Sequence, residues 1–349
     1  MLSRVANSLY WMSRYIERAD NTSRIVDVNL QLLLDHRNMN SQQFSEHWLP
    51  IIEATGDASA FWKFKDVATA ETVTDYLVFE PRNTNSLVSS ISQARENARM
   101  VRDQLTADIW EELNRLYLYL HSQKAREDWE TSPFDFLQQA KSSSLTLQGL
   151  TDATIPHNEG WLFLQAGKFL ERADMTSRIL DVRHGTLPER GIPATVSQVD
   201  ALAWASVLHS CSAWDAYKAI HGAEVHPRLV ADFLLLSDNF PRSVKFCVER
   251  LNRSLRRISG VAEGRFCNDA EKLAGRLVAQ LQFGTIDEVF QILGLHQYID
   301  ALQIQLIDIG NALFNAYIFQ PFQNLEAEIL VQQEEQQQQQ QQQAIGGRI

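Results

Sequence analysis

The apolar residues of this chain recur at helical spacing over long segments. Between residues 3 and about 37, apolar side chains that include Trp11, Tyr15 and Leu30 fall on one side of a helical projection. An apolar stripe with a period of 3.6 residues is typical of an amphipathic helix. The segment is therefore predicted as one long helix. Its opposite, polar side carries Arg14, Glu17, Asp20, Asn21, Arg24 and Asp27.

The same periodicity predicts helices along most of the remaining chain, without a strand hairpin or a glycine-rich phosphate loop. Asn83 or Asn85 can cap one of these helices. Asn239 can cap another, with Pro241 in its first turn. Residues 184–194, with two glycines and two prolines, are predicted as a loop. We expect an all-α, multi-helix bundle. The predicted helices span residues 42–54, 68–79, 83–102, 107–122, 133–150, 158–183, 198–209, 213–220, 227–236, 241–258, 269–281 and 286–319.

One stretch of sequence occurs twice. Glu-Arg-Ala-Asp at residues 17–20 recurs at residues 171–174, a spacing of 154 residues. The surrounding strings, RYIERADNTSRIVDV and KFLERADMTSRILDV, are identical at 10 of 15 positions. A match of this length indicates an internal duplication.

The repeat divides the chain into two related helical halves, residues 1–155 and 156–331. Two weaker matches at the same spacing fall at predicted helix starts, and they pair Asn85 with Asn239 and Ser89 with Ser243. Residues 332–349 form a glutamine-rich tail, which is predicted to be a frayed helix end or a disordered extension because it has almost no apolar surface to bury.

The charged residues of the repeat allow two interpretations. On a helix Glu17 faces Arg14 and Asp20 faces Arg24. The copy has the same arrangement, with Lys168 facing Glu171 and Asp174 facing Arg178. These groups are either a solvated face of weak ion pairs or a buried network between the halves. In the second case Arg18 and Arg172 also take part, and the network is a candidate anion-binding site.

A second cluster of arginines lies in the helix predicted at residues 83–102. Arg95, Arg99 and Arg102 share one stripe, with Glu96 and Asn97 between them. Like charges at this spacing are unfavourable unless an anion answers them. We expect this anion to be Glu111 or Glu112 of the next helix, or a carboxylate or phosphate of a ligand. Arg242 lies at another predicted helix start, where capping and anion binding are both open.

Composition and motifs exclude several classes of protein. The net charge is −11, which argues against a nucleic-acid binder. No uninterrupted apolar segment reaches the length of a signal peptide core or a membrane span. The three cysteines lack the spacing of a disulfide framework or a zinc ribbon, so a protein of the reducing cytoplasm is expected. No metal-binding helix motif, nucleophile elbow or Walker loop is present, and neither a metal nor a cofactor is predicted.

These motifs make the chain similar to the Alpha-E family, bacterial helical proteins with a Glu-Arg (ER) motif. The matching strings are LSRVANSLYWMSRYIERADNTSRIVDV, SSISQARENARMVRD with WEELN, WLFLQAGKFLERADMTSRILDVR and FPRSVKFCVERL. The segment near residues 314–329 resembles the family's closing segment. Ser13 replaces a glycine usual in the family, and the glutamine-rich tail is an extension.

The resemblance implies a setting rather than a reaction. Family members are encoded beside, or fused to, circularly permuted ATP-grasp proteins, and often lie near a transglutaminase-like protein or a proteasome-like peptidase. This implies a role in ATP-dependent formation of peptide-like amide bonds or in protein modification. The leading hypothesis is an accessory module that docks onto an ATP-grasp ligase. The alternatives are an enzyme that uses Glu17 and Glu171 as acid or base with arginines holding an acyl phosphate or carboxylate, and a structural scaffold.

Overall fold

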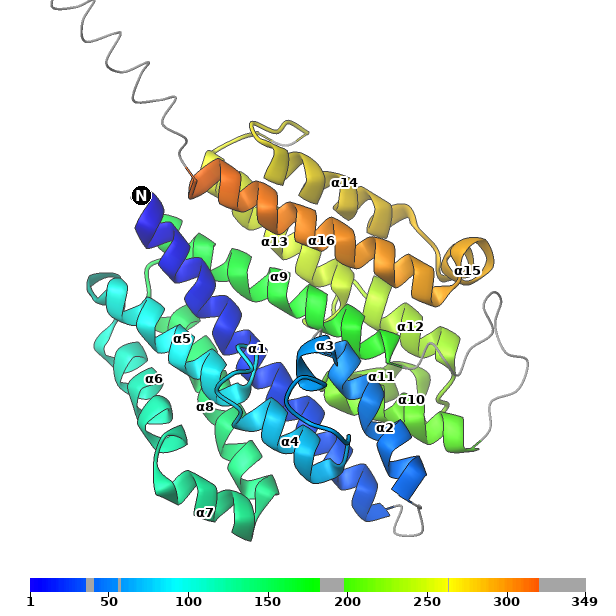
Figure 1. Cartoon of the computed structure of the whole chain (residues 1–349). Helices are drawn as coiled ribbons and strands as arrows, with labels where there is room; N and C mark the ends of the chain where they lie inside the picture. Colours follow the sequence, from blue (N-terminus) through cyan, green and yellow to red (C-terminus); the bar gives the residue numbers. More distant parts are fainter. Residues whose placement is uncertain (36–40, 56–57, 183–197, 263, 320–349) are drawn as a thin grey trace, which may run out of the picture.

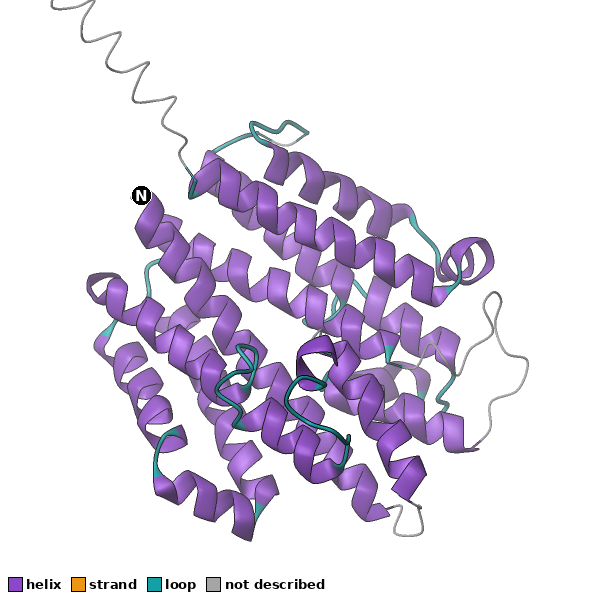
Figure 2. Cartoon of the chain, viewed as in Figure 1, coloured by secondary structure: helices purple, strands orange, loops and turns teal. Residues whose placement is uncertain are grey.

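The computed structural model describes residues 1–35, 41–55, 58–182, 198–262 and 264–319. Figure 2 shows helices joined by short loops, and the described residues contain no strand. The predicted all-α class is confirmed. The predicted loop at residues 184–194 and the glutamine-rich tail lie outside the described residues.

Two long helices form the centre of the molecule. Helix α1 (Ser3–Asp35) and helix α9 (Glu159–Asp181) lie against each other in Figure 1, drawn in blue and green. They run in the same direction, because the amino group of Met1 pairs with Glu159 and Arg18 pairs with Glu171 further along both helices. Nearly every residue of α9 is buried.

A glycine allows the two central helices to approach closely. A Cβ atom added to Gly167 of α9 would lie 2.3 Å from the backbone carbonyl oxygen of Tyr10 in α1. No other residue fits at that distance without moving one backbone. The close approach brings the charged residues of both helices into reach of each other.

The remaining helices cover the central pair on its sides, as Figure 1 shows. On α1 pack α5 (Leu87–Met100) and α8 (Pro133–Thr154), while α6 (Ala107–Leu120) packs against both of these helices and α7 (Gln123–Thr131) packs against α8. On α9 pack α13 (Val244–Ser259) and α16 (Leu295–Tyr317), and α14 (Asp269–Phe283) packs against both of them. The end of the bundle is covered by α2 (Ser41–Ala54), α3 (Ala58–Phe61), α4 (Ala70–Val78), α10 (Gln198–Ser210), α11 (Trp214–His221) and α12 (Pro227–Leu236).

Several predicted helix boundaries were wrong. The hydroxyl of Ser86 caps α5, and the hydroxyl of Ser243 caps α13, so neither Asn83, Asn85 nor Asn239 is the cap. Helix α13 therefore begins after Pro241 and Arg242. The two caps are 157 residues apart, which is three more than the repeat spacing used in the sequence comparison.

Other differences concern segments with a weak pattern. The segment predicted as one helix at 286–319 consists of a short helix α15 (Ile286–Glu288), a π-helical turn η3 (Val289–Leu293) and α16. Gly294 separates them with a φ of +85°, which glycine adopts readily. Helices α3 and α7 were not predicted. Helix α7 buries only Ala125 and therefore lacks an apolar stripe.

No helix in the described part of the chain combines the length and apolar character needed to cross a bilayer.

Candidate functional site

The polar face of α1 is turned into the protein. Glu17 is 1% exposed and Asp20 is 0% exposed, and Asn21 and Asp27 are also buried. In α9 the equivalent Glu171 is 1% exposed. The interpretation of these residues as a solvated face is therefore wrong. Glu17, Asp20 and Glu171 belong to a network of ion pairs between α1, α9 and the turn before α13, whereas Asp27 pairs separately with Lys141 of α8.

Glu171 is bound by two guanidinium groups of α1. Arg18 donates from Nε to Oε1 at 2.6 Å and from Nη2 to Oε2 at 3.1 Å, a two-pronged contact. Arg14 donates from Nε to Oε2 at 2.7 Å. Arg18 also donates to the side-chain oxygen of Asn85, and Arg14 donates to the hydroxyl of Tyr10. Both carboxylate oxygens of Glu171 are thus occupied.

Glu17 is bound in the reciprocal way by α9. Arg172 donates from Nε to Oε1 at 2.7 Å and from Nη2 to Oε2 at 2.8 Å. Arg242, from the turn before α13, donates to Oε1 at 3.0 Å, and the side-chain amide of Gln148 in α8 donates to Oε2 at 3.0 Å. Paired, two-pronged contacts of this kind are strong and directional.

In each Glu-Arg pair, therefore, the arginine binds the glutamate of the other pair across the interface. Arg14 was predicted to pair with Glu17 of its own helix, and Lys168 with Glu171. Both predictions were wrong, because Arg14 reaches Glu171 and the ammonium of Lys168 lies 3.3 Å from Asp152 of α8. In both cases the nearer carboxylate belongs to another helix, α9 for Arg14 and α8 for Lys168.

The next ion pairs along each helix were predicted correctly. Asp20 accepts a hydrogen bond from Arg24 at 2.9 Å, and Asp174 accepts one from Arg178 at 2.9 Å. Arg242 adds a contact of 2.5 Å to Asp20. One carboxylate oxygen of Asp20 and one of Asp174 are buried without a hydrogen-bond partner. Both copies of the repeated sequence share this feature.

The network holds both glutamates in the ionised form. Burial alone would raise the pKa of Glu17, but the guanidiniums of Arg172 and Arg242 outweigh it and lower the pKa to about 2. Burial likewise opposes ionisation of Glu171, and Arg18 and Arg14 lower its pKa to about 2. Both carboxylates are therefore negatively charged at neutral pH.

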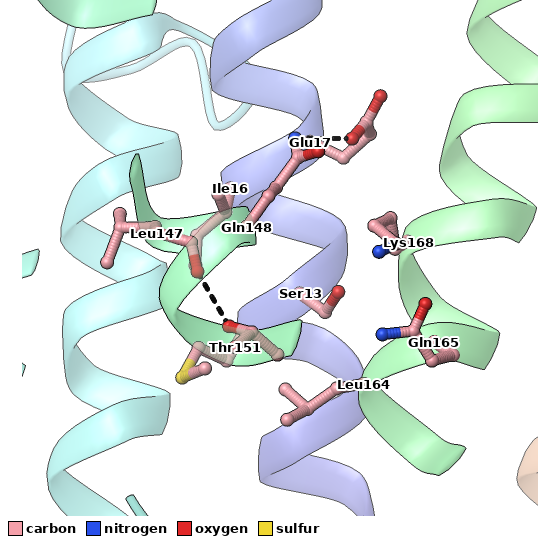
Figure 3. Close-up of a pocket in the computed structure, with 10 residues that line it drawn as sticks. Ser13, Ile16, Glu17, Leu147, Gln148, Thr151, Leu164, Gln165 and Lys168 are labelled. Atoms are coloured by element: carbon pink, nitrogen blue, oxygen red, sulfur yellow. Dashed lines mark hydrogen bonds between the residues drawn. The ribbon is translucent and has the colours of Figure 1, made fainter. Parts of the chain in front are cut away.

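The two glutamates open toward different cavities. Glu17 lines a hole of about 20 Å³ between α1, α8 and α9, which has room for about one water molecule. Figure 3 shows Glu17 and Gln148 joined by a hydrogen bond at this hole, with Ser13 and Lys168 on its walls. Glu171 lines a separate cavity of about 320 Å³, into which Arg14 and Arg18 also project.

The predicted arginine stripe of α5 does not join this network. Arg95 donates to Asn114 of α6 and to Glu96, and Arg99 is exposed and pairs with Glu96 of its own helix. Asn97 donates to the backbone carbonyl of Gln93. The expectation that Glu111 or Glu112 of α6 neutralises these arginines was wrong. Glu112 pairs with Arg115 of its own helix, and Arg102 donates to the carbonyl of Leu105.

Sequence reasoning missed several network residues. Gln148 contacts both Glu17 and Arg172, yet it lies in a helix whose sequence shows no motif. Asn85 was expected to be a helix cap but binds Arg18. Neither role leaves a signal in the local pattern, because both arise from contact between distant helices. Arg242 was a candidate, and the structure places it between Glu17 and Asp20.

Other reactive groups in the described residues lie in unreactive settings. Burial raises the pKa of Cys211 and of Cys247 to about 12, so neither is a ready nucleophile.

Asp181, His296 and Asp300 lie close enough to one another to hold a metal ion. Both ring nitrogens of His296 already face a carboxylate, at 2.8 Å from Asp181 and 3.5 Å from Asp300. We interpret this group as an ion pair joining α9 to α16.

Comparison with known proteins places these helices in a family. Uncharacterized proteins of Mycobacterium bovis and of Mycobacterium tuberculosis are 26% identical over an alignment 284 residues long, which covers 74% of this chain. The chain spans about 30% of the length of these curated relatives. No solved structure matches. The family model for Alpha-E, described as a predicted alpha-helical domain with a conserved ER motif, matches residues 1–318. With Glu-Arg pairs at 17–18 and 171–172, the chain belongs to the Alpha-E family.

Proposed function

We propose that this protein is a non-catalytic binding component of an ATP-grasp-linked system that forms peptide-like amide bonds or modifies proteins. In this proposal it docks onto a circularly permuted ATP-grasp protein, as its resemblance to the family implies. A transglutaminase-like protein or a proteasome-like peptidase of the same system is a further candidate partner. The observation that carries the non-catalytic role is the saturation of both buried glutamates by guanidinium groups.

The state of the glutamates argues against the alternative of an acid–base enzyme. A general acid or base works best with a pKa near the operating pH and needs access to the reacting proton. Glu17 and Glu171 have pKa values of about 2 and are each 1% exposed. They also line separate cavities, so they do not flank one substrate.

The arginines are the more accessible part of the network. Arg14 and Arg18 are 17% and 18% exposed, whereas the Glu171 between them is almost fully covered. Their cavity of about 320 Å³ is also lined by Arg178 and Asp174. A carboxylate of a substrate or of a partner protein would meet guanidinium groups that the glutamate already holds in place. This accessibility supports a binding role in which the protein shapes a partner's site.

The lengths of the relatives are consistent with work beside another polypeptide. The mycobacterial proteins extend well beyond the matched region. We infer that the domain acts joined to, or docked on, a further unit.

We also propose that the two halves, residues 1–155 and 156–331, arose by duplication. The support is the reciprocal pairing of Arg18 with Glu171 and of Arg172 with Glu17. The buried orphan oxygens of Asp20 and Asp174, at the spacing of the repeat, add to it.

Co-expression with a circularly permuted ATP-grasp protein from the same genome tests the proposed docking. We expect the two proteins to co-elute in size-exclusion chromatography at micromolar concentration, and the product to form only when both are present. Independent migration of the two proteins would contradict docking.

The same assay separates the other roles. Product formation that stops in Glu17→Gln or Glu171→Gln, while the complex and its thermal stability persist, would favour the enzyme. Product formation unaffected by these changes, together with a lower melting temperature, would favour a purely structural network.

A further inference from the structure

A second polar cavity is lined by a different face of α9 from the Glu171 cavity. It has a volume of about 440 Å³ and lies between α8, α9, the turn at Pro241 and α13. This volume is within the range of small-molecule sites. Its walls carry five cationic side chains, and Asp152 is the one acidic side chain among the described residues that line it.

Three of these cations have no anionic partner among the described residues. Arg250, Arg253 and Arg257 lie on α13 at positions i, i+3 and i+7, so their side chains share one face of the helix. All three are exposed, and none forms an ion pair with any described residue. Arg250 lies over the ring of Phe246 at 4.8 Å and Arg257 near the ring of Trp161 at 6.0 Å.

Such an arrangement of arginines is electrostatically unfavourable unless an anion neutralises it. Like charges three or four residues apart on a helix repel each other. Elsewhere in the described chain, the arginines of the central helices that are at least partly buried pair with carboxylates, as Arg18 and Arg172 do. No carboxylate on the described cavity wall is available to neutralise the three arginines of α13. The carboxylate of Asp152 already accepts hydrogen bonds from Lys168 and Gln165.

The spread of the charges indicates the kind of anion. Seven residues of helix separate Arg250 from Arg257, which corresponds to about 10 Å along the axis. A compact phosphate group is bound best by donors that converge on one point. Guanidiniums spread over this length fit carboxylates placed along an extended chain, each of which an arginine can hold with two hydrogen bonds.

We propose that the cavity between α8, α9 and α13 binds an oligocarboxylate, in the form of a short acidic peptide, through Arg250, Arg253 and Arg257. Lys168 and Arg172 form the buried part of the wall, and the rings of Phe246 and Trp161 lie beside the guanidiniums of Arg250 and Arg257. This inference deepens the proposed function, on which it rests for its setting, by naming a substrate class.

Isothermal titration of the full chain with the tripeptide Glu-Glu-Glu at low ionic strength tests the proposal. We expect triglutamate to bind, the uncharged Gln-Gln-Gln not to bind, and the affinity to fall as salt screens the charges. Each of R250Q, R253Q and R257Q should weaken binding by about two- to fivefold, and the triple variant by more than about tenfold.

Two further variants make the result specific. R276Q removes an exposed arginine of the neighbouring α14, outside the cavity, and should leave binding unchanged. D152N removes the acidic side chain from the wall and should tighten binding. The three cavity variants should melt at the same temperature as the parent or slightly higher, because they relieve repulsion; a merely structural role would lower it.

Several outcomes would overturn the proposal. These are the absence of triglutamate binding, an equal loss of binding in R276Q, and tighter binding of inorganic triphosphate than of triglutamate. The last result would assign the cavity to phosphates. Because the titration needs only this chain, it can fail while docking to the ATP-grasp protein succeeds, or succeed while docking fails.

Discussion

Each buried glutamate of the central helices is held by arginines from another helix. Taking a carboxylate out of water is costly, and the cost is offset only while its guanidinium partners remain in place. Removing one partner leaves the others as unpaired buried charges. The Glu-Arg residues therefore act as a group, and a change to any one should be felt by the whole interface.

Replacement of Glu171 with glutamine should destabilise the protein strongly. The neutral amide leaves Arg14 and Arg18 without their carboxylate, a loss of about 3–5 kcal/mol for a broken buried pair. Urea unfolding followed by circular dichroism measures the change. Glu96→Gln, which breaks a largely exposed pair in α5, is the control and should cost less than about 1 kcal/mol. Equal losses in the two variants would contradict a buried network.

Stability should also fall in acid because of the same carboxylates. The folded-state pKa values of Glu17 and Glu171 are about 2, below the ordinary value of 4.5. A lowered pKa means that the contribution to stability is present above the unfolded-state value and disappears as the pH falls through the folded-state value. We expect the free energy of unfolding to decrease between about pH 4.5 and pH 2. Urea titrations across this range test it, and Glu171→Gln should show a shallower decrease.

At the residue scale, the sequence identified the charged residues of the network but not the residues with which they pair. Glu17, Arg18 and their copies were singled out because they recur. Their partners were assigned within each helix, where spacing of three or four residues is the only geometry that a sequence displays. The true partner of Arg14 lies 157 positions away.

The close contact between α1 and α9 depends on one glycine. Gly167→Ala places a Cβ atom 2.3 Å from the carbonyl oxygen of Tyr10, so the helices must separate. We expect a loss of about 1–3 kcal/mol, typical of overpacking, measured as a lower midpoint in urea. Gly149→Ala in α8 is the control, since its Cβ would meet no atom within 4 Å. It should be neutral or stabilising by up to about 1 kcal/mol, because alanine favours helix. A neutral Gly167→Ala would contradict the close approach.

The joint between α9 and α16 should weaken as the pH rises. A hydrogen bond to Asp181 raises the pKa of His296 above its ordinary value. The stabilising contribution of His296 is therefore fully present below the unfolded-state pKa and is lost as the pH rises through the folded-state pKa. An NMR titration of the His296 ring should give a pKa above 6.5, and Asp181→Asn should return it toward that value. A value at or below 6.5 in the parent protein would show that the pair does not form.

At the scale of elements, strong periodicity located most helices and weak periodicity failed. Residues 227–236 form a helix with the predicted bounds, since Pro227 starts it and its apolar face is continuous. The start of α13 was placed three residues too early. A proline near a helix start is compatible with either side of the cap, and only the hydrogen bond from the backbone of Phe246 to the Ser243 hydroxyl decides between them.

At the scale of the molecule, the two halves should depend on each other. Glu17 of the first half needs Arg172 and Arg242 of the second, and Glu171 needs Arg14 and Arg18 of the first. Residues 1–155 or 156–349 expressed alone should lack a cooperative thermal transition, while the two pieces expressed together should co-purify. Circular dichroism melting and affinity capture through a tag on one piece provide the measurement. A single half that melts cooperatively as a monomer would show that the halves are independent domains.

The helical class, the positions of the Glu-Arg pairs and the lack of familiar catalytic motifs follow from the sequence, because helical periodicity and residue chemistry are local properties. Only the tertiary structure decided that the polar face of α1 is buried, that each glutamate is held by the opposite helix, and that the arginines of α13 line a cavity without an anionic partner among the described residues. These facts depend on how helices cross and how closely they approach. That geometry is the joint result of packing over the whole chain, and no single segment contains it.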